Sequence, residues 1–310
     1  MIQNPIDVLS AHPIRKNKLQ KQAFRKDVLN YARNLGYMAK EESGSFGVRN
    51  VVMGNPETAK YLVTAHYDTC AKMFMPNLIT PRNFFAYLGY QLLIVAIIYG
   101  VLSLVGMGVW WATHNKAAAF LASYCLLWVV LVLMIAGPAN KSNANDNTSG
   151  VVSVLELMRA IPREDRENIC FVLFDLEEAG LRGSGAYRNA HKKQTQDQLI
   201  LNFDCVGDGD ELWLFPTGKL RKDQKMMEAL EAICGQWGEK HLQLHSRGFS
   251  VYPSDQSNFP YGVGVAAFHR TKGGLLYVSK IHTGKDTVLE KENVTILCRQ
   301  LMKFMTGTSE

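Results

Sequence analysis

Residues 151–176 read VVSVLELMRAIPREDRENICFVLFDL and contain two patterns in succession. Apolar residues recur at helical spacing over residues 151–161, and a nearly continuous apolar run covers residues 167–176. The first pattern predicts a helix with one buried face, and the second predicts a buried strand. A helix that leads into a buried strand indicates an α/β protein, in which helices cover the faces of a sheet.

The same alternation continues through most of the chain. Apolar runs predict further strands at residues 46–54, 60–69, 198–207, 211–216 and 264–268. Helical spacing of apolar residues predicts further helices at residues 17–35, 225–238 and 291–305. We therefore expect a three-layer α/β sandwich with a mostly parallel mixed sheet flanked by helices.

Two uncharged stretches interrupt this alternation. Residues 83–115 and 117–140 contain no Asp, Glu, Lys or Arg. Within them, helices at residues 84–111 and 117–136 would be long enough to cross a hydrocarbon core of about 30 Å. Aromatic residues lie at both ends of the first helix, and the connector is short. These features predict an inserted transmembrane hairpin; a buried helical pair or hydrophobic lid in a soluble protein is the alternative.

A hairpin returns the chain to the side from which it started. Residues 1–82 and 138–310 are therefore expected to form one discontinuous domain, with residues 83–137 as an insertion. Basic residues crowd the segments beside the hairpin, whereas the connector offers only Lys116. With no signal-peptide pattern at the start, this bias predicts an integral membrane protein whose α/β domain is cytoplasmic.

Composition argues against several classes of protein. The net charge of +6 is dispersed over 310 residues, so we expect no nucleic-acid partner, although a lipid bilayer is an expected one. Six cysteines occur without a CxxC pair, which favours free thiols in a reducing compartment. Neither a GxSxG motif nor a P-loop is present, so serine-hydrolase and nucleotide-binding functions have no support.

Acidic and histidine residues follow several of the predicted strands, where open α/β sheets place their sites. One comes instead from the loop before the 151–161 helix, and one lies beyond the last predicted strand. In chain order these residues are His66, Asp68, Asp146, Glu177, Glu178, Asp204 and His282.

These residue types suit a site for two divalent metal ions. Zinc accepts imidazole and carboxylate donors, and one carboxylate can bridge two ions. Of two adjacent glutamates, one can ligate while the other takes a proton from water and passes it to a leaving amine. Asp68 lies two residues after His66, and its carboxylate can accept a hydrogen bond from the ring nitrogen of His66 that does not bind the metal. The pattern therefore predicts a metal-dependent hydrolase of amide bonds.

Six stretches of the sequence resemble the M28-type zinc aminopeptidase family, which also contains glutaminyl cyclases. The resemblance implies that the discontinuous domain is a metallopeptidase domain. The stretches are TAHYDT at 64–69, ANDNTSGV at 144–151, DLEEAGLRGS at 175–184, NFD at 202–204, SDQSNF at 254–259 and HTGKDT at 282–287.

The resemblance also implies roles for individual residues. It implies two zinc ions, for which cobalt or manganese is an alternative, with Glu177 as general base and acid and Asp68 as a residue behind His66. The implied ligands are His66 and Asp204 for one ion, Glu178 and His282 for the other, and Asp146 between them.

The sequence departs from the family pattern at three places. The interval between His66 and Asp146 is short in most members and here contains the predicted hairpin. Many members have Tyr, which can stabilise an oxyanion, where this chain has Ile281; Tyr277 and Arg247 are the candidates to replace it. Gln256 stands where some members have His.

We expect a membrane-anchored aminopeptidase that acts on peptides or aminoacyl amides, with a preference for hydrophobic substrates. An N-acyl-amino-acid amidase or a carboxypeptidase of the same fold is an alternative, and a one-metal glutaminyl cyclase is less favoured. A non-catalytic membrane scaffold is the alternative from another class. A homo-oligomer formed through the hairpin is also consistent with the sequence.

Overall fold

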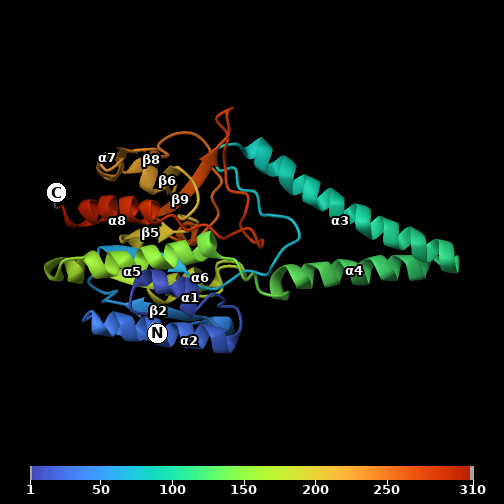
Figure 1. Ribbon diagram of the computed structural model, residues 1–310, viewed down its shortest axis with the longest axis horizontal. Helices are drawn as coiled ribbons and strands as arrows, with labels where there is room; N and C mark the ends of the chain where they lie inside the picture. The colour runs from blue at the N-terminus through green and yellow to red at the C-terminus, as the bar shows by residue number, and fades with distance from the viewer. Residues whose placement is uncertain (1, 308–310) are drawn as a thin grey trace.

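A mixed sheet forms the centre of the molecule in the computed structural model, which describes residues 2–307 (Figure 1). Ten strands lie within these residues. Their bounds are β1 (Ala39–Ser43), β2 (Arg49–Met53), β3 (Tyr61–His66), β4 (Ile169–Phe174), β5 (Leu199–Phe203), β6 (Glu211–Pro216), β7 (Gly235–Trp237), β8 (Lys240–Leu244), β9 (Gly262–Arg270) and β10 (Leu276–Tyr277).

The strand order is β1-β2-β4-β3-β5-β9-β6-β8-β7, and β10 pairs with β9. The four central strands β4, β3, β5 and β9 are parallel, whereas β1, β2, β6 and β7 each pair with an antiparallel neighbour. In the central register His66 lies opposite Phe174, so β3 and β4 end side by side. The predicted mixed sheet is confirmed, and its parallel part is the centre that positions the strand ends.

Helices cover both faces of the sheet, as a three-layer sandwich requires. Along β4, Phe171 and Leu173 pack in the same core as α2, α5 and α8, while Val172 and Phe174 pack with Tyr187 of α6 on the opposite face. The helices of the α/β part are α1 (Val8–Ala11), α2 (Lys18–Asn34), α5 (Gly150–Ala160), α6 (Arg182–Ala190), α7 (Gln224–Glu231) and α8 (Lys291–Thr306).

The helix predicted at residues 225–238 is shorter than expected. It ends as α7 at Glu231, and the chain then forms the β7–β8 hairpin. Gly238 has a φ of +59°, a left-handed conformation that suits a tight turn between these strands. Strand β1 and helix α6 were not predicted, because the centre of the first is charged and the second contains two glycines.

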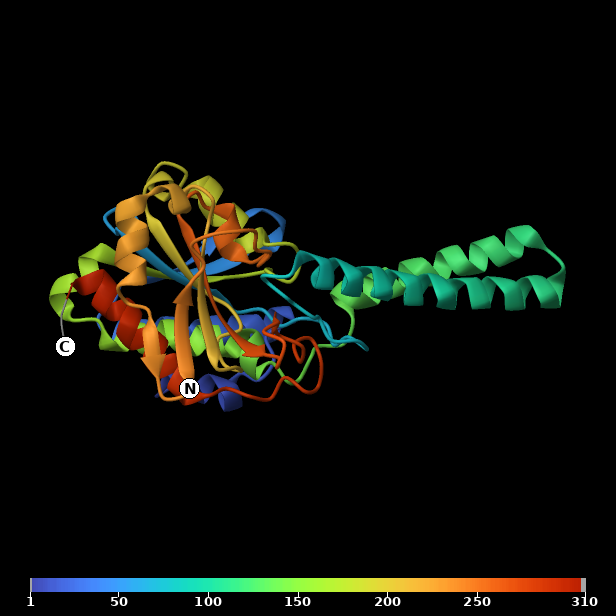
Figure 2. The ribbon, with the colours of Figure 1, turned by 90° about the horizontal axis from the view of Figure 1, so that it is seen from above.

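Two helices project from the sandwich as an antiparallel pair (Figures 1 and 2). They are α3 (Phe84–Thr113) and α4 (Lys116–Ala136). Each begins after an asparagine that caps it: the side chain of Asn83 accepts the N–H of Ala86, and that of Asn115 accepts the N–H groups of the first turn of α4. The predicted two-helix hairpin is present, and each helix is long and apolar enough to cross a membrane.

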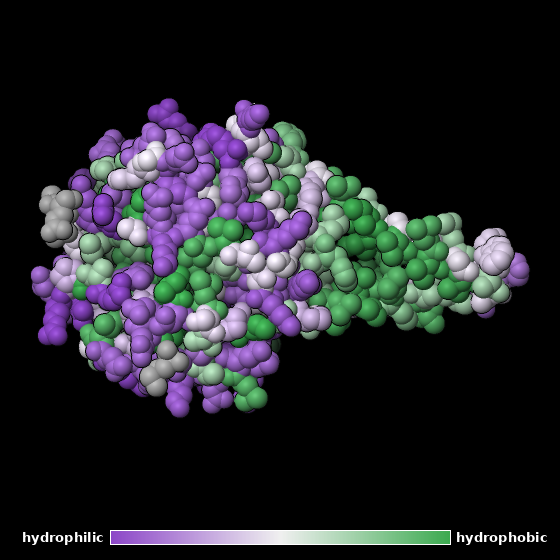
Figure 3. Space-filling model, viewed as in Figure 1, coloured by the Kyte–Doolittle hydropathy of each residue, from purple (hydrophilic) through white to green (hydrophobic). Residues whose placement is uncertain are grey.

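The hairpin exposes an apolar surface that contrasts with the polar surface of the sandwich (Figure 3). In the most apolar 18-residue window of each helix, 6% of the residues of α3 and 0% of those of α4 are buried. The pair is therefore not packed as the core of a soluble domain. All six cysteines are free, and Cys125 on α4 is exposed. At the root of the hairpin, Ala71 and Ala139 form an antiparallel bridge that brings the ends of the intervening segment together. The division into a discontinuous domain and an insertion at 83–137 stays a prediction.

Arg15 links the N-terminal segment to the ends of two central elements. Its side chain is fully buried and donates to the carbonyl of Tyr67 at 2.5 Å, just after β3, and to Thr148 Oγ1 at 3.0 Å, before α5. Burial lowers the pKa of Arg15 to about 10, with Asp68 and Asp146 opposing that effect, so the guanidinium stays charged at neutral pH.

Replacing Arg15 with Met should lower the free energy of unfolding by about 3–5 kcal/mol. The buried acceptors on Tyr67 and Thr148 would lose their hydrogen-bond donor, and the carboxylates of Asp68 and Asp146 would lose a nearby positive charge. The exposed Lys18→Met variant removes the same charge and should change stability by less than about 0.5 kcal/mol. Urea denaturation of detergent-solubilised, chelator-treated protein, followed by tryptophan fluorescence, measures both. Equal midpoints for the two variants would contradict this role.

Candidate metal centre

The predicted site residues meet at one edge of the sheet. His66 is the last residue of β3, Asp204 follows β5, and Glu177 and Glu178 follow β4. Because β4, β3 and β5 are adjacent and parallel, their carboxyl ends lie together. The turn at residues 144–149 and the loop after β10 bring the remaining members of the set to the same place.

Asp146 lies between two imidazoles and faces each with a different oxygen. His66 Nε2 is 3.3 Å from Asp146 Oδ1 and 3.7 Å from Asp204 Oδ1. His282 Nε2 is 3.1 Å from Asp146 Oδ2 and 3.4 Å from Glu178 Oε2. The side chains thus form two donor groups, each with one imidazole and one further carboxylate, that share Asp146.

The donor set fits divalent metal ions. Ligand atoms of His66, Glu177 and Asp204 lie within 4.8 Å of one another, and so do those of His66, Asp146 and Glu178. Glu178 Oε1 is buried without a hydrogen-bond partner. Several buried carboxylates this close together need a compensating positive charge. Imidazole and carboxylate donors are those that zinc prefers in catalytic sites.

The pKa values in the group show how strongly the side chains interact. Burial raises the pKa values of Glu177 and Glu178 above their ordinary range. Burial would also raise the pKa of Asp146, but His282 and His66 hold it below its ordinary value. Burial would lower the pKa of His282, but Glu178 and Asp146 raise it to about 9. This imidazole would therefore release a proton if it bound a metal ion at neutral pH, and the affinity for the metal would fall as the pH falls.

Asp68 has a wider positioning role than the sequence indicates. Its Oδ1 is 3.6 Å from His66 Nδ1, beyond hydrogen-bond distance. Its two oxygens instead accept the backbone N–H groups of Glu177, at 3.0 Å, and Glu178, at 3.3 Å. Asp68 therefore orients the turn that carries both glutamates and lies behind the ring of His66.

Asp286 is a supporting residue that sequence reasoning did not single out. Its carboxylate accepts the backbone N–H groups of Asn145 at 2.8 Å and Asp146 at 3.0 Å. Burial raises the pKa of Asp286 to about 7, and the neighbouring Asp146 adds to this effect. The signal was present in HTGKDT, which carries His282 at one end and Asp286 near the other.

Other buried polar residues surround the group. Asp255 is fully buried, accepts from Ser184 Oγ at 2.5 Å, and leaves its second oxygen unpaired. Burial raises the pKa of Asp255 to about 7. Gln256 accepts from Asn202 Nδ2 at 3.1 Å and donates to the carbonyl of Tyr252, so it joins β5 to the loop that carries Tyr252.

The oxyanion role stays unassigned among the described residues. Ile281 is buried in an apolar group of residues and supplies no donor. Tyr277 lies against the ring of His269, with 5.6 Å between ring centres, and Arg247 is exposed.

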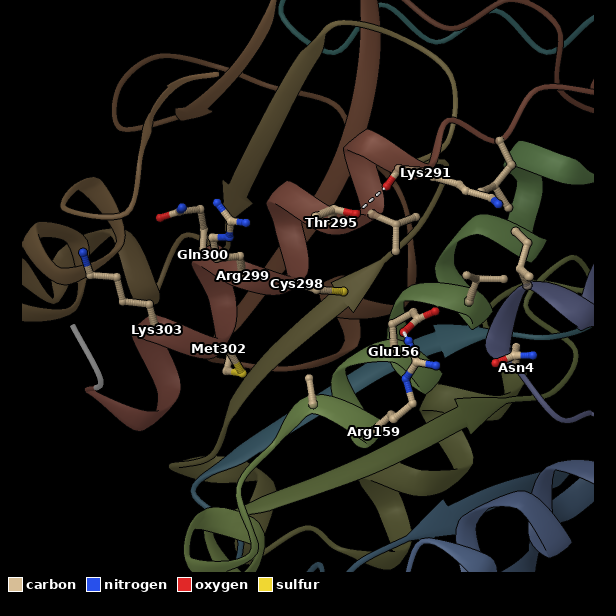
Figure 4. Close-up of a pocket in the computed structure, with 15 residues that line it drawn as sticks. Asn4, Glu156, Arg159, Lys291, Thr295, Cys298, Arg299, Gln300, Met302 and Lys303 are labelled. Atoms are coloured by element: carbon tan, nitrogen blue, oxygen red, sulfur yellow. Dashed lines mark hydrogen bonds and ion pairs between the residues drawn. The ribbon is translucent and has the colours of Figure 1, made fainter. Parts of the chain in front are cut away.

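A cleft connects the cluster to the root of the hairpin. It has a volume of about 520 Å³, and its lining includes Asp68 and Glu178 together with residues 135–137 at the end of the hairpin. A larger cavity, of about 720 Å³, lies between α5 and α8 (Figure 4). None of the seven predicted site residues lines that cavity, so the cleft beside Glu178 is the one that matches the chemistry.

Several solved structures share the fold of this protein at low sequence identity. The structure resembles Porphyromonas gingivalis glutaminyl cyclase (TM-score 0.62, 14% identity, 97% of this chain and 94% of that one). It also resembles a Zn-dependent exopeptidase from Parabacteroides distasonis (TM-score 0.60, 13% identity, 98% and 95% covered). A third match is the Legionella pneumophila LapA aminopeptidase (TM-score 0.58, 14% identity, 99% and 69% covered).

These likenesses show an α/β fold of the zinc exopeptidase type. The model of peptidase family M28 matches residues 132–299, more than half of the chain, and the protein therefore belongs to this family. No curated protein matches the sequence. The family and the donor set support a zinc-dependent hydrolase. The proximity of the predicted residues is established here, whereas their individual roles stay predictions.

Adding zinc to chelator-treated protein should raise the melting temperature by roughly 5 °C at a hundredfold excess over the dissociation constant. Asp146→Asn should remove most of this gain, because both donor groups lose their shared charge. Glu211→Gln alters a buried carboxylate that is paired with Arg270, and should keep the gain. Differential scanning fluorimetry measures the shift. An undiminished gain in Asp146→Asn would exclude this residue as a ligand.

Proposed function

We propose that the protein is a membrane-anchored di-zinc hydrolase of peptide or aminoacyl-amide bonds, and in particular an aminopeptidase. The observation that carries the proposal is the placement of Asp146, with one oxygen toward His66 and the other toward His282. A carboxylate shared by two donor groups suits two ions better than one.

Five residues would hold the metal in this proposal. A bound zinc pair supplies Lewis acidity toward a carbonyl and lowers the pKa of a bound water. Zinc is the proposed metal, and cobalt or manganese would suit the same donors. The ligands are His66 and Asp204 on one side, Glu178 and His282 on the other, and Asp146 between them.

Glu177 is the residue assigned to proton transfer. Its Oε2 is 4.0 Å from His66 Nε2, and its backbone N–H is held by Asp68. Burial raises the pKa of Glu177 well above its ordinary value, which favours a carboxyl that accepts a proton and releases it within one cycle. In this role a Glu177 carboxylate oxygen accepts the proton of the attacking water and then donates it to the leaving amine.

Alternative activities use the same centre. An N-acyl-amino-acid amidase or a carboxypeptidase differs from an aminopeptidase in what binds beside the scissile bond, and glutaminyl cyclases share the fold. A panel of free-amine and N-acylated aminoacyl amides, assayed with zinc and with a chelator, separates these activities. Chelator-sensitive cleavage of the free-amine set supports the aminopeptidase. A non-catalytic scaffold would cleave neither set.

The apolar helices supply the proposed membrane anchor. Helices α3 and α4 would span the bilayer, which places the cleft beside Glu178 close to its surface. Three basic residues flank the hairpin on the domain side (Lys72, Arg82 and Lys141), against Lys116 at its far end, so we propose a cytoplasmic domain. The lipid bilayer and a hydrophobic peptide or amide are the proposed partners, without nucleic acid, and contacts between hairpins could form a homo-oligomer.

Glu177→Gln should lower kcat by about 10²–10⁴-fold, because the amide cannot accept the proton. The same variant should keep the zinc-dependent rise in melting temperature, whereas Glu178→Gln should lose part of it. Steady-state hydrolysis of the best substrate, together with scanning fluorimetry, measures both quantities. Turnover of Glu177→Gln at the wild-type rate would remove this residue from the mechanism.

A membrane-impermeant maleimide should label Lys116→Cys in intact cells, because the connector is expected outside. Lys219→Cys, at an exposed position of the α/β part, should react only after lysis. Both substitutions belong in a Cys125→Ala background, since that thiol is exposed. The reverse labelling pattern would place the catalytic centre on the outer side.

A further inference from the structure

A separate cavity lies between the two projecting helices and residues 72–77. Its volume is about 470 Å³, within the roughly 300–1,000 Å³ of small-molecule sites. Ile94, Ile98 and Leu102 form one wall along a single face of α3, and Leu133 of α4 forms part of another. Most of the remaining lining is apolar, and its one charged side chain is that of Lys72.

The shape of the hairpin creates this cavity. The helices pack closely near Gly106, where an added Cβ would lie 2.6 Å from Ser123 Oγ. Ser123 Oγ also donates to the carbonyl of Leu102 at 2.9 Å. From there the helices diverge toward the sandwich (Figure 1), because α3 starts beside Arg82, which stacks on Trp213, whereas α4 ends near the bridge at Ala139. The divergence leaves an apolar space at the depth of the proposed bilayer.

The wall of the cavity nearest the sandwich is hydrogen-bonded to the loop that carries His282 of the candidate metal centre. The N–H of Met73 donates to the carbonyl of His282 at 2.8 Å, and the N–H of Asn77 donates to that of Ile281 at 3.4 Å. Lys72 Nζ lies against the same loop, 3.9 Å from where a Cβ on Gly284 would be. The charged end of the cavity is therefore the end that faces the catalytic residues.

We infer that this cavity binds the hydrocarbon chain of an amphiphilic amide substrate, whose polar end lies beside Lys72. The inference rests on the proposed function, because it places the amide of that substrate at the neighbouring centre. An apolar space with one cation at its end matches a single chain with a polar or anionic head. Such molecules partition into the bilayer, so they reach a cavity between two spanning helices from the side.

The first test compares chain lengths in two substrate series. Alanine alkylamides keep a free amine and carry the chain on the leaving group, whereas N-acylalanines carry it on the acyl group. For one of the two series, kcat/KM measured below the critical micelle concentration should rise at least tenfold between two and ten carbons. The series that responds identifies which side of the amide bears the chain. A flat profile in both, with hydrolysis intact, overturns the inference and leaves the proposed function standing.

A filling substitution tests the location. Ile98→Trp places an indole in the cavity and should reduce the long-to-short ratio of kcat/KM to less than about threefold. Leu104→Trp adds the same side chain to α3 at a position that is 66% exposed and outside the cavity lining. This control should keep the wild-type ratio. An unchanged ratio in Ile98→Trp would exclude the cavity as the chain site.

A binding measurement separates the two hypotheses when no substrate is cleaved. Chelator-treated full-length protein in nanodiscs is titrated with dansyl-undecanoyl-alanine. Saturable binding that is lost in Ile98→Trp and weakened severalfold in Lys72→Met supports the cavity even if the proposed activity fails. Non-saturable partition, equal in the wild type and in Ile98→Trp, would mean that ordinary lipid chains fill the space, and it would overturn the inference.

Discussion

The shared position of Asp146 is the constraint on which the site depends. One carboxylate can face two imidazoles only if the turn before α5 is held against the end of β3, and buried contacts provide this restraint. Asp286 accepts the backbone N–H of Asp146, and Arg15 binds both Thr148 in the turn and the carbonyl of Tyr67 beyond β3. Charged groups are costly to bury singly. Here the buried guanidinium offsets part of the negative charge that the carboxylates bring.

This restraint explains how the chain accommodates a long insertion between two neighbouring site residues. His66 and Asp146 are separated by the whole hairpin in sequence, yet their side chains lie 3.3 Å apart. The bridge between Ala71 and Ala139, together with the bond from the N–H of Asn140 to the carbonyl of Cys70, closes the insertion at its root. Loop-closure entropy rises only slowly with length. Because the insertion is closed at its root, a long segment can separate His66 from Asp146 without displacing the turn that carries Asp146.

The sequence could predict the sheet ends and the residues on them, because a buried parallel strand is a continuous apolar run whose carboxyl end can be located. His66, Asp204 and the paired glutamates follow from that pattern, and their proximity is confirmed. The role of Arg15 could not be predicted, because it depends on acceptors supplied by distant segments. Asp286 was missed although the motif HTGKDT carries it, because its role depends on the backbone N–H groups of a distant turn. The end of α7 was also missed, since apolar spacing continues past Glu231 into residues that pair as β7.

The two donor groups differ in what supports them. His66 and Asp204 come from central strands of a rigid sheet, whereas Glu178 and His282 both border the root of the hairpin. The cleft beside Glu178 is walled by the end of α4, and the carbonyl of His282 is held by the segment that leads to α3. A change in hairpin tilt would therefore act on the second group through both of its unshared ligands. The first group would stay fixed by strand pairing, so in the proposed membrane-anchored di-zinc protein any influence of the bilayer would enter through the second group.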